Sequence, residues 1–296
     1  MRRPSSIELQ LLTVITLWAL NITLTRYILT HGFQPLAYTT VRYGLAAAAF
    51  VVLTVAAERT LRITRSDLAV AGVAVAALVL NQIGFVYSLR TTSASVIALI
   101  LAATPLFAAL IGLALGTERL SRRFWVGAAV SFAGVGLVAL GTGAEIDSDA
   151  GGILLGMLTA ITWAVYSVSI TPLMQRYSPF RISAVVLVAA WVPLALIGLP
   201  QTRSQTWDLG WEVWALLVFA TFGPLLVTNV LWFRSLDRIG PARATLATNL
   251  QPFVGAMFAV VLLSETLTAV QAGGGVLIAA GILVVRRRGT ATPPGE

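Results

Sequence analysis

One sequence pattern occurs twice in this chain of 296 residues. Residues 88–138 align without a gap on residues 235–285, which lie 147 positions later, and Pro105 falls on Pro252. In both copies an apolar stretch with a proline ends in a short Glu-x-Leu segment, and a second apolar stretch with the spacing Gly-x6-Gly follows. A chain with such an internal sequence repeat is expected to fold as two related halves that share one arrangement of helices.

The arginines are the part of the pattern that does not repeat. The first copy carries three of them in TERLSRRFW, whereas the second copy reads SETLTAVQA and has no basic residue there. Near the start of each copy the difference is reversed, because TTSASV is uncharged and its partner RIGPAR carries Arg238 and Arg243. Arginine marks the cytoplasmic side of membrane proteins. The displaced arginines therefore predict that the two copies cross a membrane in opposite directions.

The composition is that of a membrane protein. Apolar residues make up 57% of the chain and charged residues only 11%, which is too little charge to cover a soluble domain of this length. The net charge of +8 comes from arginines in short loops, so we interpret it as a sign of membrane orientation and expect no nucleic-acid partner. The chain has no cysteine, no lysine and one histidine, His31, so we expect no catalytic thiolate, no metal site and no cofactor.

Ten apolar stretches are long enough to cross the lipid bilayer as helices of about 20 residues. They cover approximately residues 8–29, 35–57, 67–89, 93–116, 124–141, 151–173, 180–199, 211–235, 241–263 and 268–286. The first is expected to be retained, because no small-residue cleavage site follows it. The predicted fold class is an all-α integral membrane protein whose ten transmembrane helices form two inverted five-helix repeats around a central cavity.

The distribution of arginines predicts the orientation of these helices. With the N-terminus in the cytoplasm, 16 arginines fall on the inside, whereas only Arg90 and Arg203 fall in outside loops. Both termini are therefore expected in the cytoplasm. We expect the first repeat over residues 1–143, the second over residues 150–286, and a disordered cytoplasmic tail over residues 287–296.

Several short motifs together resemble the EamA branch of the drug/metabolite transporter superfamily. They are Trp18-x-x-Asn21 in the first helix, Gly-Thr-Glu118-Arg-Leu after the fourth, and Pro252 with Ser-Glu265-Thr-Leu in the ninth. Their order, spacing and duplication are specific, and the resemblance covers the whole chain. It implies alternating access through a central cavity in a bacterial inner membrane. As in YddG-like aromatic amino-acid exporters, it also implies an aromatic or apolar amino acid, or a related metabolite, as the small-molecule substrate.

Polar and aromatic residues in the middle of the helices are the candidates for substrate binding. Polar groups are costly in hydrocarbon unless they are paired or line a hydrated cavity. Each proline frees a backbone carbonyl, amides bind charged groups, and aromatic faces hold apolar groups or cations. The candidates are Trp18, Asn21, Asn81, Gln82, Tyr87, Thr104, Pro105, Trp163, Tyr166, Asn229, Trp232, Asn249, Gln251 and Pro252. The alternative is structural, because mid-membrane amides also join helices and aromatic residues also form interfacial belts.

For several charged residues and glycines, a structural role is the preferred interpretation. Arg42 and Arg26 can act as anchors that extend to the membrane surface, with anion binding as the alternative. Glu118 and Glu265 are expected to cap loops or pair with arginine. The Gly-x6-Gly stretches predict a shared packing face, which could serve a homodimer, so monomer and homodimer both stay open.

The absence of carboxylates from the middle of every predicted helix bears on energy coupling. Ion-coupled carriers generally need such a group, so we expect a carrier that follows a substrate gradient or exchanges substrates. No Walker motif is present, and we expect no ATP hydrolysis. Two other functions compete with an exporter: a sugar-phosphate or nucleotide-sugar exchanger, which would need several cations in the cavity, and a membrane enzyme or lipid-handling protein, for which the sequence offers no catalytic cluster.

Overall fold

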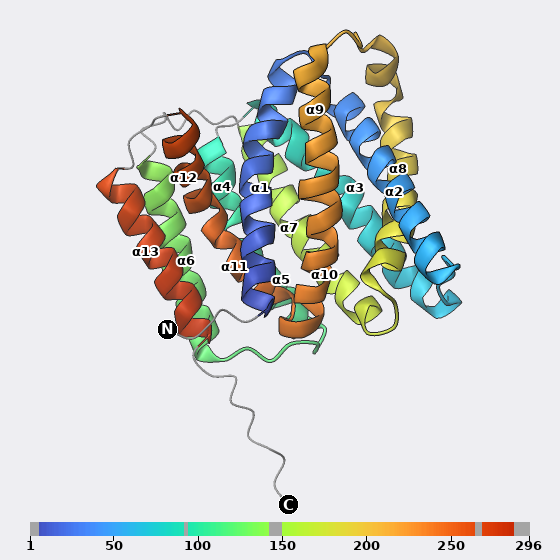
Figure 1. The fold of residues 1–296 in the computed structure, drawn as a ribbon. Coiled ribbons are helices and arrows are strands. Elements are labelled where there is room, and N and C mark those ends of the chain that lie inside the picture. The colour runs from blue at the N-terminus through green and yellow to red at the C-terminus, as the bar shows by residue number, and fades with distance from the viewer. Residues whose placement is uncertain (1–5, 92–93, 142–149, 264–267, 287–296) are drawn as a thin grey trace, which may run out of the picture.

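The computed structural model describes residues 6–91, 94–141, 150–263 and 268–286, and every regular element in these ranges is a helix. Figure 1 shows the helices standing side by side as one bundle. The helices of the first half are α1 (Ser6–Thr30), α2 (Pro35–Glu58), the 3₁₀ turn η1 (Arg65–Asp67), α3 (Leu68–Thr91), α4 (Ala94–Leu101), α5 (Thr104–Ala114) and α6 (Arg122–Leu140).

The second half repeats this order with more interruptions. Its elements are α7 (Ala150–Met174), α8 (Pro179–Ser204), α9 (Gly210–Thr221), the π-helical turn η2 (Phe222–Val227), α10 (Thr228–Ile239), α11 (Pro241–Ala247), the 3₁₀ turn η3 (Thr248–Leu250), α12 (Gln251–Leu263) and α13 (Ala269–Arg286). Among the described residues, seven helical stretches are long and apolar enough to cross a membrane, and shorter apolar helices lie in the fourth and tenth predicted segments. The predicted all-α membrane fold is confirmed.

Three of the predicted helices are broken, and proline accounts for the breaks. Pro105 lies in the first turn of α5, and Pro252 lies in the first turn of α12. Proline is tolerated in a first turn because its missing N–H would be unpaired there in any case. The interruptions before α5 and α12 fall at equivalent positions of the sequence repeat. The third break, η2, contains Pro224, and the sequence interpretation did not anticipate it.

The two halves run in opposite directions. α1 begins at the lower end of Figure 1, and α7, the first helix of the second half, ends there. Arg176, just after α7, bonds Asp67, just before α3, at this same end. We call this lower end the arginine-rich end, since α2, α5, α7 and α10 all finish there among the arginine-bearing loops. The arrangement is the one expected of a duplicated, inverted unit.

Glycines join the last helices of the two halves, α6 and α13. A Cβ atom on Gly127 would lie 2.5 Å from the carbonyl oxygen of Gly281, and one on Gly134 would lie 2.7 Å from that of Gly274. Such contacts allow two antiparallel backbones to touch. The predicted glycine packing face is therefore present. It lies inside one chain, between its halves, and this use leaves these glycines unavailable as a dimer contact.

Candidate functional site

A cavity of about 150 Å³ lies between the two halves. Residues of α1, α2, α3 and α7 line it, together with η2, the start of α10 and the breaks before α5 and α12. Nine of the candidates from the sequence lie in its wall. They are Trp18, Asn21, Asn81, Gln82, Thr104, Trp163, Tyr166, Asn229 and Gln251.

The other five candidates lie behind or beside this cavity. Asn249 and Pro252 line a smaller adjoining pocket of about 50 Å³. Trp232 is fully buried behind the wall, and Pro105 is buried at the start of α5. Tyr87 lies further along α3, where its hydroxyl accepts a hydrogen bond of 3.0 Å from Nε2 of Gln201 on α8. Tyr87, Pro105 and Trp232 are therefore not among the residues that line this cavity.

Tryptophans form one side of the cavity. The ring centroids of Trp18 and Trp163 are 5.3 Å apart and nearly perpendicular, and Trp232 packs behind both at 5.0 and 6.0 Å. Trp18 Nε1 donates hydrogen bonds to Thr228 Oγ1 at 2.9 Å and to the carbonyl of Pro224 at 3.1 Å. The π-helical turn around Pro224 thus fixes the orientation of one indole ring, and π-helical turns of this kind are frequent at functional sites.

The amides in and near the cavity bond to neighbouring helices. Asn81 Nδ2 donates to the carbonyl of Thr159 at 2.9 Å, which joins α3 to α7. Gln82 Nε2 in turn donates to Asn81 Oδ1 at 3.0 Å. Asn229 Nδ2 and Asn249 Nδ2 lie 3.4 and 3.2 Å from serine hydroxyls on α8 and α6. The structural role that the sequence left open for these amides is therefore realised, while Asn81, Gln82 and Asn229 also face the cavity.

Arg42 was missing from the candidate set, yet it lines the cavity. Its side chain is only 6% exposed, and the guanidinium donates to Asn21 Oδ1 at 3.0 Å and to the carbonyl of Ala220 at 3.1 Å. The prediction that Arg42 extends to the membrane surface is wrong. An arginine inside an apolar helix was itself the signal for a functional position. The side chain of Arg26 lies outside the described residues.

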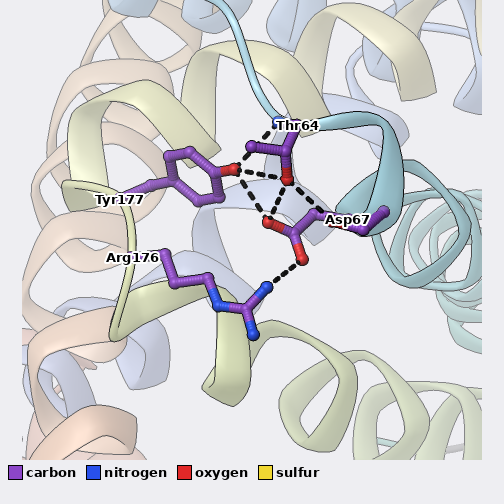
Figure 2. Close-up of polar contacts among 5 residues, drawn as sticks. Thr64, Asp67, Arg176 and Tyr177 are labelled. Carbon is purple, nitrogen blue, oxygen red and sulfur yellow. Dashed lines mark hydrogen bonds and ion pairs between the residues drawn. The ribbon is translucent and has the colours of Figure 1, made fainter.

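Contacts between the two halves close the arginine-rich end. Figure 2 shows Asp67, the last residue of η1, with its carboxylate bonded to Arg176 Nη1 at 2.6 Å and to the hydroxyl of Tyr177 at 2.8 Å. Thr64 adds a further donor to the same carboxylate at 2.8 Å. Arg181 and Glu58 form a second pair across the halves at 2.6 Å. Both pairs join the α2–α3 connection of the first half to the α7–α8 connection of the second.

Glu118 makes another contact between the halves at this end. Its Oε1 accepts a hydrogen bond of 3.2 Å from the backbone N–H of Ala242, in the first turn of α11. Burial raises the pKa of Glu118, and the Ala242 N–H and nearby Arg243 oppose this shift. The predicted capping role is confirmed for Glu118, with the difference that it caps a helix of the opposite half. Glu265, its repeat partner, lies outside the described residues.

The opposite end is joined by neutral amides. The side-chain oxygen of Gln205 accepts a hydrogen bond of 2.7 Å from the backbone N–H of Gln34, and that of Gln201 accepts one of 2.7 Å from Leu36. These bonds occupy donors at the start of α2, which a helix leaves unpaired.

The helices of the fourth and ninth predicted segments have different neighbours at the two ends of the molecule. At the arginine-rich end, α5 packs on α11. At the opposite end, α4 packs on α6 and α7, and α12 packs on α1 and α6.

A bundle of apolar helices around a central aromatic and amide-lined cavity is the architecture of a membrane transporter. The sequence pattern of the EamA-like transporter family matches residues 5–140 and again residues 150–287. The chain therefore belongs to the EamA-like transporter family. It is a multi-pass membrane protein, and it is a transporter and not an enzyme.

Relatives of known name agree with this assignment. The chain is 26% identical over 282 residues to an uncharacterized transporter of Archaeoglobus fulgidus, which covers 93% of this chain and 96% of the relative. It is 28% identical over 200 residues to a probable amino-acid metabolite efflux pump of Salmonella typhimurium, covering 64% and 67% of the two chains. It is 25% identical over 190 residues to a probable terminal-alkyne amino-acid exporter of Streptantibioticus cattleyicolor, covering 64% and 63%.

The same fold has been solved in another protein. A crystal structure with 22% sequence identity superposes with a TM-score of 0.81 and covers 96% of this chain and 99% of that one. At this identity the likeness establishes the fold and carries no information on the substrate.

Proposed function

We propose that the protein exports amino acids, aromatic or apolar ones first, or closely related small metabolites, across a bacterial inner membrane. The observation that carries this proposal is the cavity between the halves, which joins a tryptophan wall to amide groups near the middle of the helices. Aromatic faces suit an apolar side chain or an ammonium group, and amides suit the polar end of an amino acid. The names of the Salmonella and Streptantibioticus relatives support the same substrate class.

The distribution of arginines supports one orientation in the membrane. The loops at the arginine-rich end carry most of the basic residues, so this end faces the cytoplasm and both termini lie there. The two repeats proposed for residues 1–143 and 150–286 then cross the membrane in opposite senses. The tail over residues 287–296 belongs to the cytoplasmic side and lies outside the described residues.

The contacts at the two ends support alternating access. Ion pairs and the packing of α5 on α11 close the cytoplasmic end, whereas α4 and α12 pack on different neighbours at the other end. This asymmetry supports a state whose cavity is closed toward the cytoplasm. Exchange of these contacts between the inverted halves would open the cavity to the cytoplasm in its turn.

A sugar-phosphate or nucleotide-sugar exchanger is the second candidate, and Arg42 in the cavity wall is the observation in its favour. Phosphate groups are bound by several cations at once. Arg42 is the only arginine among the described residues that line the cavity. This single charge favours the amino-acid exporter.

Efflux from proteoliposomes tests the proposal. Liposomes that contain the purified protein and labelled phenylalanine should lose the label faster than protein-free liposomes. Replacing Trp163→Ala should slow this efflux about tenfold or more, because it removes one of the two indole rings that line the cavity. Trp211→Ala is the matched control, since that ring is 78% exposed at the periphery. Efflux equal to that of protein-free liposomes for each of several apolar and aromatic amino acids would contradict the proposal.

A further inference from the structure

We propose that Arg42 is the group that binds a carboxylate in the cavity, so that the substrate is a carboxylic acid. This inference rests on the proposed function and adds to it a chemical requirement, namely one negative charge at one end of the substrate. It excludes amines, amides and esters of the same carbon skeleton as good substrates.

The first observation is a buried positive charge. Arg42 is the eighth residue of α2, about 10 Å along the helix from its start at Pro35. Its side chain is turned inward and is 6% exposed. Arginine stays protonated in proteins, so this position carries a full charge away from water.

The second observation is the kind of partner that Arg42 has. Nε and Nη2 donate to the carbonyl of Ala220 and to Asn21 Oδ1, and the guanidinium lies 5.7 Å from the ring centre of Tyr38. All of these partners are neutral. Neither of the two ion pairs found among the described residues includes Arg42. A buried charge is generally paired with an opposite one, and the guanidinium of Arg42 has no such counter-charge among the partners named here, so an anion in the cavity would supply it.

The third observation is the place of this charge. Arg42 lies in the cavity wall with Asn21 and Trp18, and the hydrogen bond from Arg42 holds the Asn21 amide in one orientation. No carboxylate side chain belongs to the described lining. An anion in the cavity would therefore meet one cation and no competing negative charge.

The surroundings restrict the anion further. Planar guanidinium groups bind planar carboxylates through two parallel hydrogen bonds. The single cation suits one carboxylate, and the indole faces of Trp18 and Trp163 suit an apolar or aromatic remainder, or an ammonium group. The geometry thus matches a small acid that carries an apolar or aromatic group.

The test measures how tightly the full chain in detergent binds three probes: phenylalanine, phenylalaninamide and phenethylamine. Binding is detected by the rise in the unfolding temperature of the protein when the probe is added. Phenylalanine should bind the wild-type protein about 10- to 100-fold more tightly than the two probes without a carboxylate, which is the range for a charge-assisted contact. Arg42→Gln should remove this preference, and Arg42→Lys should restore part of it. Arg203→Gln, which removes an exposed arginine at the same end of the molecule, should leave the preference unchanged.

Equal binding of phenylalanine and phenylalaninamide by the wild type, or binding of neither, would overturn the inference. The inference would also be overturned if Arg42→Gln and Arg203→Gln changed the preference for phenylalanine over phenylalaninamide to the same extent. The wild-type comparison needs no variant, so it decides even if Arg42→Gln does not fold. Efflux tests the proposed function separately. Carboxylate-selective binding without efflux would contradict the exporter and support the role of Arg42. Equal efflux of phenylalanine and phenylalaninamide would support the exporter and contradict the role of Arg42.

Discussion

Gly127 on α6 and Gly281 on α13 touch through their backbones, and a Cβ atom on either would lie 2.5 Å from the carbonyl oxygen of the other. Since the obstacle is backbone, the two helices would have to separate to admit a side chain. We expect Gly127→Ala to destabilise the protein by about 1–3 kcal/mol, which is typical of overpacking. The thermal unfolding temperature in detergent should fall accordingly.

Gly72→Ala is the control for this change. Gly72 lies inside a helix, α3, and nothing lies within 4 Å of the Cβ position. The variant should unfold at or slightly above the wild-type temperature. Equal unfolding temperatures for Gly127→Ala and Gly72→Ala would show that the α6–α13 contact is looser than the structure indicates.

Asp67 accepts three hydrogen bonds, and two of them come from the opposite half. We expect Asp67→Asn to weaken the closure of the arginine-rich end, because the ion pair with Arg176 is lost. The chain has no cysteine, so Gln251→Cys in the cavity can be labelled selectively. Asp67→Asn should increase its labelling by an impermeant maleimide added to the cytoplasmic side of inverted vesicles.

Asp237→Asn is the matched control, because Asp237 is an exposed aspartate near the same end. It should leave labelling of Gln251→Cys at the wild-type rate. Unchanged labelling in Asp67→Asn would mean that this ion pair does not hold the cytoplasmic end closed.

Glu118 should make stability depend on pH. Burial raises its pKa in the folded state above that of an unfolded chain, so the folded protein favours the protonated acid. The resulting stabilisation is fully present below the unfolded pKa and is lost as the pH rises through the folded pKa. Glu118→Gln keeps a side-chain oxygen for the Ala242 N–H and carries no charge. Its unfolding temperature should match the wild type at low pH and exceed it increasingly as the pH rises.

Glu212→Gln reports the effect of removing an exposed carboxylate. A difference between Glu118→Gln and wild type that stays constant with pH, or that shrinks as the pH rises, would contradict this account of Glu118.

The sequence predicted where the helices lie better than which way each helix faces. Pro105 and Pro252 mark breaks because proline disturbs a helix wherever it lies, whatever surrounds it. The inward turn of Arg42 depends instead on how α2 is rotated against α8. In a soluble protein an apolar stripe reveals that rotation, but lipid and protein interior are both apolar, so a membrane helix carries little such signal.

The same reason explains the outcome for the aromatic candidates. Trp18 and Trp163 line the cavity, whereas Trp232, which has the same side chain, packs behind them. The π-helical turn around Pro224 directly precedes α10 and bonds Trp18, and a turn of this kind has no clear sequence pattern. The sequence could place all three rings inside the bundle, but it could not show which of them line the cavity.

Transport should not require a pH gradient. The described lining of the cavity contains no Asp, Glu or His, so it offers no side chain that would exchange a proton with the substrate site near neutral pH. Glu118 titrates at the arginine-rich end, away from this lining, and acts on a contact between the halves. Efflux of labelled phenylalanine from proteoliposomes should therefore proceed at the same rate with and without an imposed pH gradient. The measurement compares both conditions at one internal pH, so that effects on Glu118 cancel. Efflux that stops when the gradient is dissipated would show that a proton is coupled to substrate movement and that the coupling group lies outside the described lining.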